Sequence, residues 1–135
     1  MRSVFVDTVY WVAVLRPNDP FSGWARQAKA SLGAVELVTT DEVLVEFLGF
    51  VSGAGRYVRQ AAVAAVEEIL SSRTVLVLPQ SHESFLAGLT LYARRLDKGY
   101  SLVDCISMNA MRSRSIREVL TDDRHFAQEG FVLPL

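Results

Sequence analysis

Short apolar runs along the chain alternate with longer stretches in which apolar residues recur at helical spacing. The short runs are rich in Val, Leu and Phe and are bounded by polar or turn-forming residues, as expected of strands buried on both faces. The predicted strands cover residues 3–6, 35–39, 75–78, 118–121 and 131–133.

The stretches between the strands predict helices with clear start signals. Ser81 and Ser101 are good N-caps, Asp41 can cap the helix after it, and Asp19 followed by Pro20 is typical of a helix start. The predicted helices cover residues 8–15, 20–32, 42–52, 56–70, 81–96 and 101–113, with a helical turn at 125–127. Without a repeat or linker, this alternation predicts one domain over residues 1–135. Its fold class is α/β, a three-layer α/β/α sandwich with a mainly parallel central sheet.

The segment SLVDCISM, residues 101–108, places a carboxylate inside an apolar helix. Its apolar residues cover most of the helix circumference, so Asp104 is expected to be buried among them. An isolated ionised carboxylate in such surroundings costs several kcal/mol or takes up a proton. Asp104 therefore needs a cation, a hydrogen-bond network or a proton.

Asp7, Glu46 and the pair Asp122–Asp123 share this character. Asp7 ends the first predicted strand, and Asp122 and Asp123 follow the fourth. Since the carboxyl ends of parallel strands meet at one edge of a sheet, these groups are expected to converge there. Glu46 comes from the otherwise apolar helix 42–52, as Asp104 comes from its own helix.

Several converging carboxylates repel one another unless a cation lies between them. Oxygen ligands select Mg²⁺ or Mn²⁺, and the chain has no Cys/His cluster of the zinc type. A metal held by carboxylates can activate a water and neutralise charge on a phosphodiester. We therefore predict a metal-dependent nuclease that cuts RNA. The predicted catalytic and metal-binding residues are Asp7, Glu46, Asp104 and one member of the pair Asp122–Asp123.

Each of these residues also has a purely structural explanation when it is taken alone. Asp7 could cap a helix, Glu46 could pair with a buried Arg, and one of Asp122 and Asp123 is expected to cap the helical turn at 125. The remaining candidates are interpreted as structural: His82 and His125 as surface or capping groups, Tyr10, Trp11 and Trp24 as core or interface aromatics, and Cys105 as packing.

The composition indicates the class of protein and its cellular compartment, but it says little about the reaction. Half of the residues are hydrophobic, which indicates a globular chain, and no apolar run approaches the roughly 20 residues of a membrane span. The single cysteine excludes an internal disulfide framework, so we expect a soluble cytoplasmic protein. The net charge of −1 is unusual for a tight nucleic-acid binder, but it is compatible with an enzyme that clusters its acids.

Four segments in order, VFVDTVYWVAVL, TTDEVLVEFLGF, GYSLVDCISM and VLTDDRHFAQEGF, resemble the PIN domain as carried by VapC-type ribonuclease toxins. The resemblance implies a parallel-sheet α/β/α fold, an acidic site that binds Mg²⁺ or Mn²⁺, and cleavage of single-stranded RNA. It matches Asp7, Glu46 and Asp104 to family acids. The last family motif has a Thr, an Asp two residues later and a Phe three residues after the Asp, which here are Thr121, Asp123 and Phe126. The resemblance therefore implies Asp123 as the fourth catalytic and metal-binding acid, with Asp122 as its substitute.

The same resemblance implies supporting residues and partners. Thr8 and Thr121 would be hydroxyls near the metal or the phosphate. The chain would form a homodimer and bind a cognate antitoxin, which threads a peptide into the acidic groove, often with an Arg near the carboxylates. Candidates for gripping the RNA backbone are Arg56, Arg59, Arg94, Arg95, Lys98, Arg112 and Arg124.

Two other functions stay open from the sequence. One is a catalytically silent PIN-like module that binds RNA or a protein. The other is a small metal-dependent phosphohydrolase. An aspartyl-phosphate mechanism needs a second Asp two residues after the first, and this chain has Val9 there.

Overall fold

The structure is a computed structural model that describes residues 1–134. Its strands form one sheet in the order β3-β2-β1-β4, and every pairing between them is parallel. The predicted parallel sheet is therefore confirmed. The segment 131–133 makes only an isolated bridge between Val132 and Glu118, so the fifth predicted strand is wrong. The strands are β1 (Arg2–Val6), β2 (Val35–Thr40), β3 (Val75–Leu78) and β4 (Glu118–Leu120).

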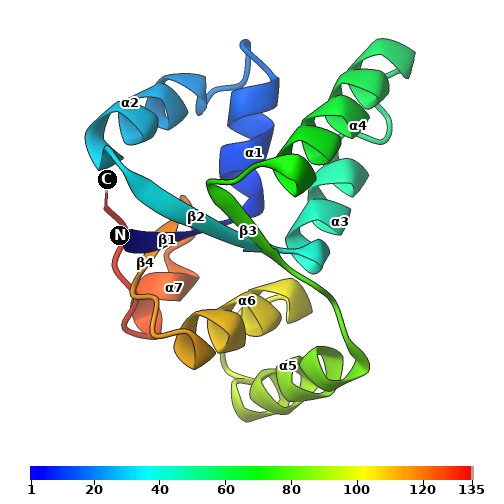
Figure 1. Cartoon of the computed structure of the whole chain (residues 1–135). Coiled ribbons are helices and arrows are strands. Elements are labelled where there is room, and N and C mark those ends of the chain that lie inside the picture. Colours follow the sequence, from blue (N-terminus) through cyan, green and yellow to red (C-terminus); the bar gives the residue numbers. More distant parts are fainter. Residues whose placement is uncertain (135) are drawn as a thin grey trace.

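Helices cover both faces of this sheet. Figure 1 shows α1 to α4 on one side and α5 to α7 on the other, which confirms the predicted three-layer α/β/α sandwich. No helix within residues 1–134 is long and apolar enough to cross a membrane. The helices are α1 (Thr8–Leu15), α2 (Ser22–Leu32), α3 (Asp41–Phe50), α4 (Arg56–Ser71), α5 (His82–Arg94), α6 (Leu102–Ser113) and α7 (His125–Gln128).

Two predicted helix starts differ from those observed. Asp19 does not cap α2, because its Oδ1 accepts the N–H of Phe21 at 2.9 Å in a turn before the helix. Thr40 caps α3, since its Oγ1 accepts the N–H of Val43 at 3.0 Å. Asp41 is the first helical residue instead, and its carboxylate accepts the N–H of Gln80.

The core is built on the central strand β1, which is covered on both faces. Val4, Phe5 and Val6 have no exposed surface. Tyr10 and Trp11 of α1 are also buried, as their predicted core role requires.

The helices α5 and α6 pack at close range on the other side. A Cβ placed on Gly88 of α5 would lie 2.5 Å from Cγ1 of Ile106 on α6. Cys105 on α6 is fully buried, as expected of a packing residue.

Candidate functional site

The ends of β1 and β4 bring Asp7 and Thr121 together. The N–H of Asp7 donates to the carbonyl of Leu120 at 3.1 Å, which continues the ladder between the strands. The hydroxyl of Thr121 then donates to Oδ2 of Asp7 at 2.8 Å and accepts the N–H of Asp123 at 3.0 Å. Both Asp7 and Thr121 are buried, so the Asp7 carboxylate is oriented by a partner shielded from water.

Asp104 is held by the start of α6. Its Oδ2 accepts the N–H of Ser101 at 3.0 Å, and Oγ of Ser101 accepts the N–H of Asp104 at 3.0 Å. This reciprocal pair is a capping box, which places Asp104 in the first turn and not in the middle of the helix. The hydrogen-bond network that a buried Asp104 requires is thus partly supplied by Ser101.

Asp123 and His125 complete a compact group with Asp104. Nδ1 of His125 lies 3.1 Å from Oδ1 of Asp123 and 3.6 Å from Oδ2 of Asp104. One potential ligand atom from each of the three residues lies within 4.8 Å of the other two. Among residues 1–134 this is the one group of three or more Asp, Glu, His or Cys side chains close enough to hold a metal ion.

His125 is predicted from the sequence to be a surface or capping group, whereas the structure places its ring in this acidic group. The N-cap position of α7 is Arg124, so the predicted cap at Asp122 or Asp123 is wrong. Oδ1 of Asp123 instead accepts the N–H of His125 at 2.9 Å in the turn before the helix, and Asp122 is exposed. The sequence does contain a signal for this position of His125. Asp123 and His125 are only two positions apart at a predicted turn, and a turn can bring both side chains to the same side of the chain.

Glu46 reaches the site from the exposed side of α3. The helix buries Val43, Leu44 and Phe47 on its other side, so Glu46 is not buried among apolar residues as we had expected. The hydroxyl of Thr8 donates to Oε1 of Glu46 and holds the carboxylate over the start of α1.

A single cavity of about 600 Å³ connects these groups, and we call it the acid cavity. No Lys or Arg stands among the described residues that line it. Its lining includes Asp7, Thr8, Glu46, Ser101, Asp104, Asp122, Asp123 and His125.

The electrostatics of the acid cavity are unfavourable for several carboxylates without a cation. Burial raises the pKa of Asp7 to about 7, and repulsion from Asp104 and Glu46 adds to this, while hydrogen bonds from Thr8 and Thr121 oppose it. Burial also raises the pKa of Asp104, and the charge of Asp123 contributes. Buried Nδ1 of His125 lacks a hydrogen-bond partner among the described residues.

These features fit a divalent metal ion. Carboxylate oxygens are the ligands that Mg²⁺ and Mn²⁺ prefer, and an imidazole nitrogen with no other partner can join them. A cation there would stabilise the charged forms of Asp7 and Asp104, whose pKa values are raised first by burial and further by repulsion between the carboxylates.

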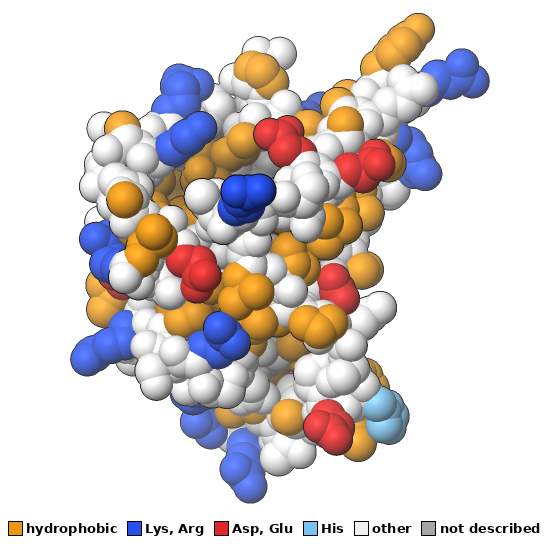
Figure 2. Space-filling view, in the orientation of Figure 1, with side chains coloured by type: hydrophobic (Ala, Val, Ile, Leu, Met, Phe, Trp, Pro, Cys, Tyr) orange, Lys and Arg blue, Asp and Glu red, His pale blue; other side chains and the backbone are white. Residues whose placement is uncertain are grey.

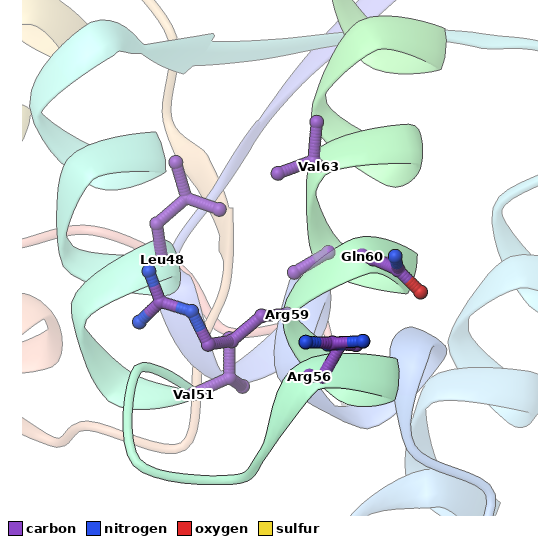
Figure 3. Close-up of a pocket in the computed structure, with 7 residues that line it drawn as sticks. Leu48, Val51, Arg56, Arg59, Gln60 and Val63 are labelled. Carbon is purple, nitrogen blue, oxygen red and sulfur yellow. The ribbon is translucent and has the colours of Figure 1, made fainter.

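The predicted RNA-binding residues divide between different places. Arg56 and Arg59 line a separate apolar groove between α3 and α4, with Leu48 and Val63 (Figure 3). Figure 2 likewise shows Lys and Arg side chains spread over one face in separate groups, not in a continuous stripe. Arg94 lines neither this groove nor the acid cavity, but a surface hollow beside α5.

Glu129 engages two more of the predicted cations. Its carboxylate accepts hydrogen bonds from Arg95 at 2.9 Å and from Arg112 at 2.8 Å. The Tyr100 hydroxyl donates to the same carboxylate at 2.9 Å. Of the seven candidates, only Lys98 and Arg124 are next in sequence to residues that line the acid cavity.

Comparison with known proteins finds similar sequences and a similar solved structure over nearly the whole chain. The sequence profile of the PIN domain matches residues 4–131. The 23S rRNA-specific endonuclease VapC20 of two Mycobacterium tuberculosis strains is 32% identical over 131 residues, which cover 96% of this chain and 95% of the relative. The crystal structure of M. tuberculosis VapC20, described as a sarcin-ricin loop cleaving toxin, matches with a TM-score of 0.84 at 29% identity. That match covers 96% of both chains.

Proposed function

This chain belongs to the PIN domain family and is a homologue of a VapC-type toxin endonuclease, and we propose that it is itself a metal-dependent endoribonuclease. The observation that carries this proposal is the acid cavity, which Asp7, Glu46, Asp104, Asp123 and His125 line and which has no Lys or Arg among its described lining residues. The relative's stated specificity supports ribosomal RNA as the substrate class.

Mg²⁺ or Mn²⁺ held by Asp104, Asp123 and His125, with Asp7 and Glu46 beside them, would supply an activated water and neutralise charge on the phosphodiester. The chain's own contribution is to orient the ligands. Thr121 and Thr8 fix the carboxylates of Asp7 and Glu46, and Ser101 fixes that of Asp104.

The family likeness also supports the proposals about setting. We propose that the protein acts in the cytoplasm as the toxin of a toxin–antitoxin pair, forms a homodimer, and is inhibited by a cognate antitoxin. The rival functions, a silent binding module and a phosphohydrolase, make different demands on the site. A silent module does not need a metal, and a phosphohydrolase would prefer a small phosphomonoester to RNA.

Cleavage of RNA by the purified protein tests the proposal directly. A pool of structured and single-stranded RNA that includes a 23S rRNA fragment is incubated with Mg²⁺, with Mn²⁺ or with chelator. We expect cutting that needs the metal and that Asp7→Asn and Asp104→Asn abolish, since each change removes a negative charge from the proposed metal site. The matched control is Asp97→Asn, because the Asp97 side chain is 76% exposed and outside the acid cavity. Equal cutting by Asp104→Asn and Asp97→Asn would refute the assignment.

A further inference from the structure

The rim of the acid cavity carries an aromatic side chain that the metal chemistry does not use. Phe21 is 37% exposed and lines the acid cavity. It also lines an adjoining cavity of about 400 Å³ together with Trp24, Asp122 and Arg124. Phe21 and Asp122 are therefore shared walls of two neighbouring hollows, one acidic and one containing an Arg.

The position of this ring is fixed from behind. Asp19 holds the backbone N–H of Phe21 at 2.9 Å. The Phe21 ring meets Trp24 edge to face with centroids 6.3 Å apart, and Trp24 meets Tyr10 in the same way at 6.1 Å. Tyr10 is only 5% exposed, so this aromatic series anchors Phe21 to the core while part of its ring stays open to solvent.

The charges of the two cavities are complementary to a nucleotide chain. The acid cavity lacks Lys and Arg among its described lining residues, so it takes a phosphate only through a metal. Arg124 is the single Lys or Arg lining the adjoining cavity, and it makes no ion pair within residues 1–134. Its charge is therefore available to a second phosphate.

Resting on the proposed ribonuclease function, we propose that Phe21 is a stacking platform for the base beside the scissile phosphate, and that Arg124 contacts the next phosphate. Unpaired bases of single-stranded RNA stack on aromatic rings in sequence-tolerant binding sites, and Arg side chains contact the backbone between them. An RNA strand that runs from the acid cavity past Phe21 to Arg124 would meet these contacts in turn.

The test pairs Phe21→Leu with a matched control, Phe85→Leu. Phe85 is 43% exposed on α5 and stacks on His82, away from both cavities. An RNA that the wild-type protein cuts is prepared with an abasic residue at one position at a time around the cut. We expect Phe21→Leu to lower kcat/KM about 10-fold or more, because a lost base–aromatic stack has that effect. We expect Phe85→Leu to leave it unchanged and Phe21→Trp to restore it.

The abasic series identifies the base concerned. At one position, removal of the base should lower the kcat/KM of the wild-type protein about 10-fold. The same removal should change the kcat/KM of Phe21→Leu little, because this variant has already lost the stacking contact. The proposal would be overturned if, at every position, removal of the base lowered the kcat/KM of wild type and of Phe21→Leu by the same factor. Normal RNA cleavage by Phe21→Leu would also overturn it, and would assign the ring to a protein contact instead.

A binding measurement separates this proposal from the proposed function. RNAs with 2-aminopurine at successive positions are added to Asp104→Asn protein, and stacking on Phe21 should quench the fluorescence at one position. The further change Phe21→Leu should abolish that quenching. Wild-type protein that quenches but cuts no RNA would refute the nuclease alone, whereas cutting without Phe21-dependent quenching would refute the stacking platform alone.

Discussion

Changing Glu129 to Gln should destabilise the protein through the loss of one charge. The Glu129 side chain is 6% exposed and accepts hydrogen bonds from Arg95, Arg112 and Tyr100. Chiefly because of the Arg95 hydrogen bond, its pKa falls from 4.5 to about 2. The substituted amide would keep the shape of the side chain but leave two guanidinium groups without an anion.

The pKa of Glu129 gives the scale of the expected effect. The difference between 4.5 and about 2 corresponds to roughly 3 kcal/mol at 1.36 kcal/mol per pH unit. The two Arg side chains are 35% and 41% exposed, so water screens part of this interaction. We expect Glu129→Gln to lower the free energy of unfolding by about 2 kcal/mol at pH 7.

Urea denaturation across a range of pH measures this difference, with Glu67→Gln on the exposed side of α4 as the control. Because the folded pKa of Glu129 lies below its unfolded value, its contribution is complete above about pH 4.5 and is lost as the pH falls toward 2. The gap between wild type and Glu129→Gln should therefore shrink in acid. A gap that widens in acid, or one equal to that of Glu67→Gln, would contradict the reasoning.

Three other predictions follow from contacts in and near the site. Because burial raises the pKa of Asp7 to about 7, Mn²⁺ binding should release protons at neutral pH, and the affinity for Mn²⁺ should fall as the pH drops below 7. Calorimetry in buffers of different ionisation enthalpy measures the proton release. His125→Gln should weaken Mn²⁺ binding by about 10-fold or more while thermal stability without metal stays close to wild type, and unchanged affinity would remove His125 from the ligand set. Gly88→Ala should cost about 1–3 kcal/mol of unfolding free energy because of the contact with Ile106, whereas Gly49→Ala on α3 meets open space and should be neutral or stabilising.

The sheet and its acids could be predicted because they depend on local patterns. A strand such as β1, buried on both faces, leaves a continuous apolar run in the sequence, and the acid after it must lie at the carboxyl edge. Asp7 and the pair Asp122–Asp123 were predicted to lie at this edge because each follows a predicted parallel strand. Their proximity in the structure agrees with that prediction, while their catalytic roles stay a prediction.

Features that depend on the direction of a side chain could not be predicted. Glu46 was expected on a buried face, but the apolar pattern of α3 does not show which side of the helix meets the cavity. Arg95 and Arg112 were expected to contact RNA, and nothing local indicates that Glu129, 34 and 17 positions away, accepts their hydrogen bonds. Helix starts also failed where two polar residues competed, as with Thr40 and Asp41.

The neighbouring positions of β1 and β4 have a consequence for the synthesis of the protein. Asp7 and Thr121 touch although they are 114 positions apart, and β4 pairs directly with β1. A nascent chain that has emerged as far as α6 therefore has Asp7, Glu46 and Asp104 but neither Thr121 nor the Asp123 group. The hydrogen bond that orients Asp7 and the group around Asp123 can therefore form only after β4 and the segment that follows it have been synthesised.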